Sequence, residues 1–209
     1  MVTTGARASA LSKVLARAGM TPTGKPPAPR LSTLTADAAA NVMDIYYRLG
    51  GTLLEPPLRP GTWDLSFDGI LIELDEGFHF NRYRATTLDS GWARDLPWRS
   101  AYLDYCTQHE RHSGTGGRRW SSPSATRMFG GTDPDGVFGD HGSSRWKQRA
   151  LYDSVKDASA GAGDVRLSRV SIYDTIDGIL LDHALYGRAS LPPARVKEHV
   201  LSRLTRLTP

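Results

Sequence analysis

The clearest pattern of apolar and polar positions lies in residues 62–75. Every second position on each side of Asp68-Gly69 is apolar: Trp63, Leu65, Phe67, Ile70, Ile72 and Leu74. An Asp-Gly pair between two alternating runs is the strongest short-range signal for a hairpin with a two-residue turn. Such a turn fixes the register, so we expect Leu65 to face Ile72 and Asp64 to face Glu73. The apolar face of this hairpin must be buried.

Apolar spacing predicts most of the remaining elements. The predicted helices cover residues 6–19, 36–49, 98–107, 145–158, 175–187 and 192–207, and the further strands cover 52–54 and 165–173. The proline-rich stretch 21–30 is interpreted as a linker, and 111–144, rich in Gly, Ser and Asp, as a loop or lid. The order of elements indicates an α/β protein.

The other face of the predicted hairpin is acidic. It carries Thr62, Asp64, Ser66, Leu71, Glu73 and Asp75. We expect Asp64 and Glu73 to lie roughly 5 Å apart at Cβ, where like charges repel. Two carboxylates coexist there if one holds a proton or if a cation lies between them. Because Mg²⁺ prefers carboxylate oxygens and water, this face is predicted to be a metal site.

Two other interpretations of the acidic face stay open. A sheet face in contact with water can carry acids without any function, although this one has three acids and no base. Carboxylates about 5 Å apart also suit a retaining glycosidase. The positive net charge of the chain does not favour that activity.

The charge of the chain favours an anionic partner. Its 209 residues carry a net charge of +4, with a pI of about 9.3. Residues 1–36 contain five basic residues and no acid, which predicts either a phosphate-contacting arm or a disordered tail.

The number of cysteines and the length of the apolar runs indicate the cellular compartment in which the protein is expected. Cys106 is the only cysteine, which excludes an intrachain disulfide and suits a reducing compartment. No apolar run reaches the roughly 18 residues of a membrane span, and the N-terminus lacks a secretory signal. We therefore expect a cytoplasmic protein with no membrane partner.

The hairpin resembles the PD-(D/E)XK nuclease superfamily. In the stretch WDLSFDGILIELDEGFH, Asp64 is followed after an eight-residue gap by Glu73-Leu74-Asp75 and then by His79. This arrangement is similar to the very-short-patch-repair-like branch of the superfamily. Gln148 and Tyr152 resemble a Gln-x-x-x-Tyr motif that some members carry on the helix after the acidic hairpin. At i and i+4 the two side chains share a helix face.

The resemblance implies a fold and a domain organisation. The expected fold is α/β, with a restriction-endonuclease-like αβββαβ core, a mixed central sheet and C-terminal helices. A nuclease-like domain would cover residues 35–209, with a large insertion at about 77–143. A basic arm and linker would precede it over residues 1–34.

The resemblance also implies a Mg²⁺-dependent endonuclease that hydrolyses DNA phosphodiester bonds in repair, restriction or phage defence, with Mn²⁺ as an alternative metal. Asp64 and Glu73 would be the metal ligands. Asp75 stands where the superfamily has a lysine, and it would be an outer ligand or would orient the base. Lys147 or His79 would take the place of the missing lysine, and Gln148 would position the substrate or the water. The implied catalytic residues are therefore Asp64, Glu73, Asp75, His79, Lys147 and Gln148.

DNA contacts are expected from two places. Arg118-Arg119-Trp120 pairs positive charge with an aromatic ring, which fits phosphate contact with base stacking and equally fits a surface loop. Tyr152 is expected to contact nucleic acid as well. Because the motif lysine is missing, a catalytically inactive nucleic-acid-binding module of the same fold is the alternative function. A soluble α/β interaction protein is a third interpretation, and a homodimer is left open.

Overall fold

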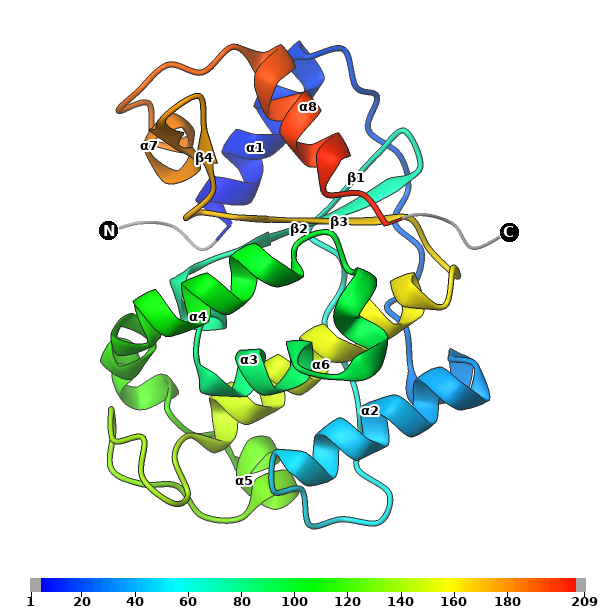
Figure 1. Cartoon of the computed structure of the whole chain (residues 1–209), viewed down its shortest axis with the longest axis vertical. Coiled ribbons are helices and arrows are strands. Elements are labelled where there is room, and N and C mark those ends of the chain that lie inside the picture. The colour runs from blue at the N-terminus through cyan, green and yellow to red at the C-terminus, as the bar shows by residue number, and fades with distance from the viewer. Residues whose placement is uncertain (1–4, 206–209) are drawn as a thin grey trace. The chain divides into compact units, whose positions relative to one another are not determined.

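The computed structural model describes residues 5–205, apart from the side chains of 116–118, as two units (Figure 1). Unit 1 combines residues 5–27, Thr62–Glu76 and 163–205, and unit 2 combines Ala28–Gly61 and Gly77–Ala162. This division differs from the predicted arm over 1–34 and nuclease-like domain over 35–209. Leu11 and Leu15 of helix α1 (Ala6–Arg17) are buried in the apolar core of unit 1. Residues 6–17 therefore belong to a folded unit.

Unit 1 is built on a mixed three-stranded sheet in the order β1-β2-β3. Strand β1 (Leu65–Phe67) is antiparallel to β2 (Ile70–Asp75), which is parallel to β3 (Leu167–Ser171). Helices α1, α7 (Leu181–Leu185) and α8 (Pro193–Ser202) share an apolar core with one face of this sheet (Figure 1). A small hairpin of β4 (Thr175–Ile176) and β5 (Ile179–Leu180) precedes α7.

The predicted register of the first hairpin is confirmed. Leu65 pairs with Ile72, and Phe67 pairs with Ile70. The turn residues Asp68 and Gly69 have φ values of 49° and 72°, the left-handed backbone that an Asp-Gly turn adopts readily. The apolar face joins the core of unit 1 as predicted.

In the part that the structure describes, unit 2 consists of helices and the loops that connect them, with no strand. Its α-helices are α2 (Ala36–Arg48), α3 (Arg82–Leu88), α4 (Arg99–Ser113), α5 (Pro123–Phe129) and α6 (Ser144–Gly161). Its 3₁₀ helices are η1 (Leu31–Thr33), η2 (Gly77–His79), η3 (Gly91–Asp95) and η4 (Gly114–Arg119).

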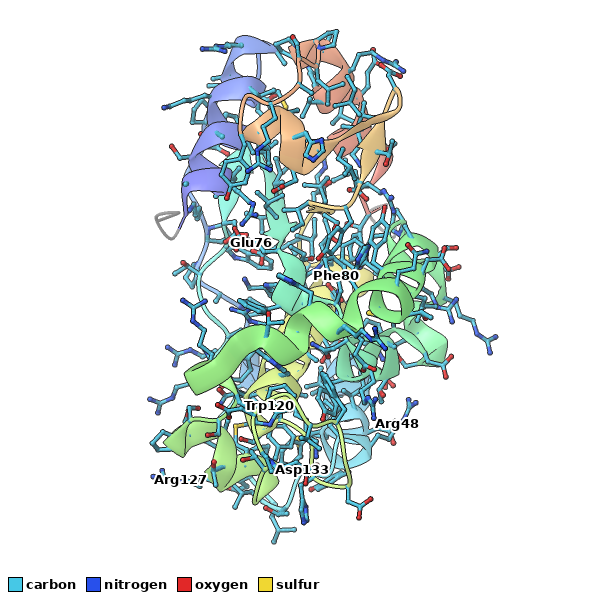
Figure 2. The ribbon with its side chains drawn as sticks, turned by 90° about the vertical axis from the view of Figure 1, so that its left-hand side faces the viewer. Arg48, Glu76, Phe80, Trp120, Arg127 and Asp133 are labelled. Atoms are coloured by element: carbon cyan, nitrogen blue, oxygen red, sulfur yellow. The ribbon has the colours of Figure 1, made fainter. Side chains whose placement is uncertain are left out.

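Helix α6 is the central element of unit 2. It packs against α2, α3 and α5, and Trp146, Leu151 and Val155 are buried in the shared core. Ser143 caps its start by accepting a hydrogen bond from the Trp146 N–H. Phe80, labelled in Figure 2, precedes α3, and its ring meets the rings of Tyr102 and Tyr105 of α4 edge-on.

Several predicted elements differ from the structure. Residues 52–54 form no strand. The predicted loop over 111–144 contains the end of α4, η4 and α5. The predicted helix over 175–187 starts as the β4–β5 hairpin, and its helical part is limited to α7. The α/β class is confirmed, with a small mixed sheet and many helices.

Within residues 5–205, no helix combines the length and the apolar character that crossing a bilayer requires.

Candidate functional site

The structure brings Asp64 and Glu73 together at the open end of the first hairpin. The backbone N–H of Asp64 donates to Glu73 Oε1 at 3.1 Å, and the N–H of Leu74 donates to Asp64 Oδ2 at 3.0 Å. Each carboxylate therefore accepts a hydrogen bond from the backbone on the other side of the hairpin, where Asp64 directly precedes β1. Asp64 is exposed, whereas Glu73 is 4% exposed. This is the predicted pair, and the backbone contacts hold both side chains in place.

Lys25 lies beside this pair, although no local pattern predicted its position there. Its Nζ donates to the backbone carbonyl of Asp64 at 2.7 Å. Two contacts along β1 position the segment: the Thr23 N–H donates to the Ser66 carbonyl at 3.0 Å, and the Thr23 and Ser66 hydroxyls lie 2.8 Å apart. Residues 21–25 of the predicted linker thus run along strand β1 and bring a lysine to the acidic pair.

Asp75 is engaged by a buried arginine of the neighbouring strand. Nη1 of Arg169 donates to both carboxylate oxygens of Asp75, at 2.8 and 3.0 Å. Asp75 is 1% exposed and Arg169 is 0% exposed. The pair neutralises both charges, and a metal-binding role for Asp75 would require it to open.

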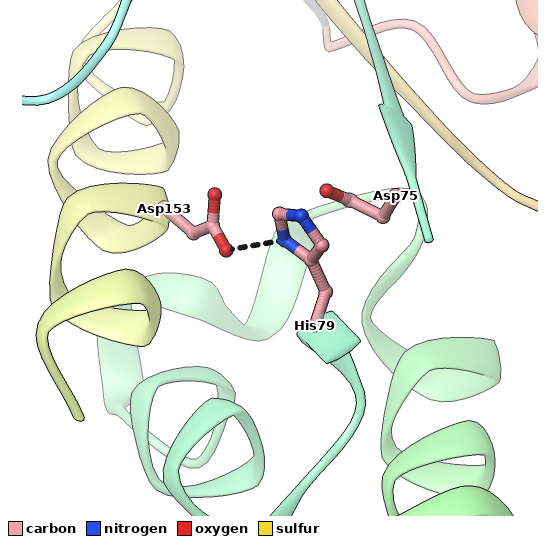
Figure 3. A group of neighbouring side chains, drawn as sticks. All are labelled: Asp75, His79 and Asp153. Atoms are coloured by element: carbon pink, nitrogen blue, oxygen red, sulfur yellow. Dashed lines mark hydrogen bonds and ion pairs between the residues drawn. The ribbon is translucent and has the colours of Figure 1, made fainter. Parts of the chain in front are cut away.

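His79 is oriented by a carboxylate of α6. Its Nδ1 lies 2.8 Å from Oδ2 of Asp153 (Figure 3). A carboxylate at Nδ1 favours the tautomer that carries its proton there, which makes Nε2 the basic nitrogen. Figure 3 also draws Asp75, which belongs to unit 1.

Lys147 makes its contacts inside unit 2. Its Nζ lies 5.7 Å from the centroid of the Tyr83 ring. Burial lowers the pKa of Lys147 below its ordinary value, and the negative charge of Asp133 counteracts part of that shift. The side chain is thus directed at α3 and the loop before α6.

Gln148 and Tyr152 line one cavity of unit 2, as their shared helix face predicted. The cavity has a volume of about 560 Å³. Gln148 is 2% exposed and donates from Nε2 to Ser124 Oγ at 3.3 Å. The Tyr152 hydroxyl donates to the Pro57 carbonyl at 3.4 Å.

The predicted stacking role of Trp120 is wrong. Trp120 is 1% exposed in the core of unit 2, where its ring meets Phe138 edge-on at 5.0 Å (Figure 2). A buried indole cannot stack on a base. Arg119 is exposed and lies 5.9 Å from the Phe78 ring centroid, whereas the side chain of Arg118 lies outside the described residues.

Other polar residues of these sites were missed from the sequence. They are Lys25, Asp153 and Arg169, together with the cavity-lining Arg59, Arg127 and Arg145. A signal existed for Arg145, which is three residues before Gln148 and therefore on the same helix face. A charged residue inside the apolar strand predicted over 165–173 was a signal for Arg169, because a buried cation needs a partner.

Comparison with known proteins gives a family. The model of DUF7255, a family of unknown function, matches residues 44–187. No curated protein and no solved structure matches the chain. The matched span includes the Asp64–Glu73 pair, the His79–Asp153 pair and the Gln148 cavity, and it omits α1 and α8. Since the match covers well over half of the 209 residues, the chain belongs to the family of unknown function DUF7255.

Proposed function

We propose that this protein hydrolyses phosphodiester bonds of DNA with the help of a divalent metal ion. The observation that carries the proposal is the Asp64–Glu73 pair, in which the Asp64 N–H donates to Glu73 and the Leu74 N–H donates to Asp64 across the open end of the first hairpin. The resemblance of this hairpin to PD-(D/E)XK nucleases and the positive net charge of the chain support a nucleic-acid substrate.

The donor set of the pair fits Mg²⁺ or Mn²⁺. Both ligand side chains offer carboxylate oxygens, the donors that hard divalent cations prefer. Asp64 accepts the hydrogen bond from the Leu74 N–H through Oδ2 and is exposed, so a hydrated ion can approach it. Asp75 does not fit, because the buried Arg169 neutralises it. When bound, such an ion polarises the scissile phosphate and acidifies a bound water.

Lys25 supplies a positive charge at the acidic pair. The superfamily lysine is absent from the position after Leu74, and the structure brings Lys25 to the backbone of Asp64 instead. An ammonium group there would attract the substrate phosphate and stabilise negative charge that develops on it. We therefore assign Lys25 the role of contacting the substrate.

The test is cleavage of plasmid DNA by the full chain with Mg²⁺ or Mn²⁺. Asp64→Asn and Glu73→Gln should each lower the cleavage rate at least about 100-fold, because each ligand holds charge where the transition state needs it. Asp177→Asn is the matched control, since Asp177 is an exposed acid of the same unit, paired with Arg195. It should cut at the rate of the unmodified protein.

Three basic candidates are compared in the same assay. Lys25→Met should slow cleavage about 10- to 100-fold. His79→Asn and Lys147→Met test the two bases expected from the sequence. Failure of the unmodified protein to cut DNA or RNA with either metal would contradict the proposal.

The alternative is a nucleic-acid-binding module without catalysis. The Asp75–Arg169 pair favours it, because the residue in the motif's lysine position is engaged in a buried ion pair. DNA binding that weakens steeply with salt, without cleavage under either metal, would support this alternative.

A further inference from the structure

Three arginines line the 560 Å³ cavity of unit 2. Arg59 comes from the segment before the first hairpin, Arg127 from α5 and Arg145 from α6. Gln148 and Tyr152 complete the polar part of the wall. All of these residues belong to unit 2, so one folded unit builds the whole cavity.

Helix periodicity explains why these side chains converge. On α6, Arg145, Gln148 and Tyr152 are three and four residues apart, and such positions share one face of a helix. On α5, Ser124 and Arg127 are three residues apart and face the same cavity. The two helices are joined by the hydrogen bond from Gln148 to Ser124.

No acid neutralises these three arginines within residues 5–205. None of Arg59, Arg127 and Arg145 forms an ion pair with a carboxylate in that part of the chain. Two other arginines of unit 2 do have acid partners: Arg82 pairs with Glu110 at 2.8 Å, and Arg84 pairs with Asp157 at 2.7 Å. The cavity therefore carries concentrated positive charge, which favours an anionic ligand.

Gln148 fixes the orientation of one guanidinium group. Its Oε1 accepts from Arg145 Nη1 at 2.6 Å, while its Nε2 donates to Ser124 and lies 3.4 Å from the Met128 sulfur. The buried amide is thus held at both ends. An arginine fixed in this way loses less conformational freedom when it binds a ligand.

The charges of Arg145 and Arg59 influence the pKa of the Tyr152 hydroxyl. Burial raises the pKa of Tyr152 above its ordinary value, while a hydrogen bond from the Arg59 backbone and the charges of Arg145 and Arg59 act in the opposite direction. The hydroxyl therefore keeps its proton at neutral pH, and it could donate to an anion by exchanging its 3.4 Å hydrogen bond to the Pro57 carbonyl for one to the ligand.

We propose that this cavity binds a phosphate group carried by a larger molecule. Arginine guanidinium groups match phosphate oxygens in a bidentate manner, and a terminal phosphate offers three oxygens and close to two negative charges. A carboxylate would offer only two oxygens and one charge to three arginines. The volume exceeds that of a bare phosphate ion and lies in the usual range for small-molecule ligands. A nucleotide or the end of a nucleic-acid strand carries such a phosphate.

The test is equilibrium binding to the full chain in EDTA, which separates it from the metal-dependent nuclease proposal. The probes are inorganic phosphate, a 5′-mononucleotide, its nucleoside, and one oligonucleotide with and without a 5′-phosphate. Phosphate-bearing probes should bind at least tenfold more tightly than their phosphate-free counterparts. Tighter binding of the mononucleotide indicates a free nucleotide, and tighter binding of the oligonucleotide indicates a strand end.

Matched arginine variants test whether the phosphate-bearing probes bind in this cavity. Arg127→Gln should weaken binding of the phosphate-bearing probe at least tenfold, whereas Arg48→Gln, an exposed arginine of α2 outside the cavity, should change it less than twofold (Figure 2). Arg127 is exposed and has no acid partner in residues 5–205, so its loss should leave the fold intact. Arg145→Gln and Arg59→Gln should show the same loss. Equal weakening by Arg127→Gln and Arg48→Gln, or no preference for phosphate-bearing probes, would overturn the proposal.

Discussion

Arg169 in unit 1 and Arg127 in unit 2 show two ways in which a folded unit can use an arginine. Arg169 is buried, and the acid of the neighbouring strand, Asp75, neutralises it. Arg127 lines a cavity with two further arginines, and no acid pairs with it in residues 5–205. The first arrangement completes its own charge balance, whereas the second leaves positive charge for another molecule to neutralise.

The same contrast applies to the acids. Asp174 of unit 1 is surrounded by its own partners: His199 Nε2 at 2.9 Å and Arg203 Nη2 at 3.3 Å. The Asp64 and Glu73 carboxylates instead accept hydrogen bonds from the backbone across the open end of the first hairpin, from the Leu74 N–H and the Asp64 N–H. We infer a structural role for the balanced groups. The Asp64–Glu73 pair remains the candidate for binding a cation in unit 1, and the three arginines of the cavity are the candidates for binding a phosphate in unit 2.

The largest expected effect is the loss of Arg169. Arg169→Met leaves the buried Asp75 carboxylate without its charge partner, and breaking a buried pair in this way costs about 3–5 kcal/mol in the free energy of unfolding. Arg127→Met should change that free energy by less than about 0.5 kcal/mol, because it removes an exposed side chain. Urea unfolding followed by circular dichroism measures both.

A double variant controls for the change of shape at this site. Arg169→Met combined with Asp75→Leu removes both charges and should recover most of the lost stability. If Arg169→Met and Arg127→Met cost the same, the distinction between balanced and unbalanced arginines would have no energetic basis.

The second expected effect is stabilisation by Mg²⁺. A ligand that binds only the folded protein adds about 2.7 kcal/mol at 100 times its dissociation constant. Glu73→Gln should abolish this increment and leave the metal-free protein equally or more stable, because it removes a like-charge contact while Oε1 can still accept from the Asp64 N–H. Melting temperatures with and without Mg²⁺ measure the effect. A Mg²⁺ increment that survives in Glu73→Gln would move the metal away from this pair, and Asp177→Asn serves again as the control.

The two hairpins of unit 1 show how far the sequence could be used to predict the fold. Both turns are Asp-Gly with left-handed φ, at Asp68-Gly69 and at Asp177-Gly178. The first lies between two long alternating runs, so strand, register and buried face were all predictable. The second lies between strands of two residues each, too short for alternation to outweigh the helical spacing around it. The local signal was the same, but the flanking pattern was missing.

The candidate sites show a different limit. Asp64 and Glu73 are joined by one turn, so local geometry predicts their contact. Arg169 is 94 residues from Asp75, and Lys25 is 39 residues from Asp64. Contacts over such separations depend on how strands and segments assemble, which no local spacing determines. The stacking prediction for Trp120 was wrong for a related reason, because two neighbouring arginines do not determine whether an indole is buried.

The smallest expected effect concerns Lys147, whose ammonium is only partly buried between Tyr83 and the charge of Asp133. Because burial lowers its pKa in the folded protein, the unfolded chain holds the proton more tightly in the pH range below 10.5. Stability therefore rises with pH in that range, since folding is favoured wherever the unfolded state binds more protons. Lys147→Met and Lys147→Arg cannot titrate there, so the unmodified protein should gain stability relative to both as pH is raised from 7 to 9.5. Urea unfolding at each pH measures the difference, and parallel curves for all three proteins would show that Lys147 keeps its ordinary affinity for protons.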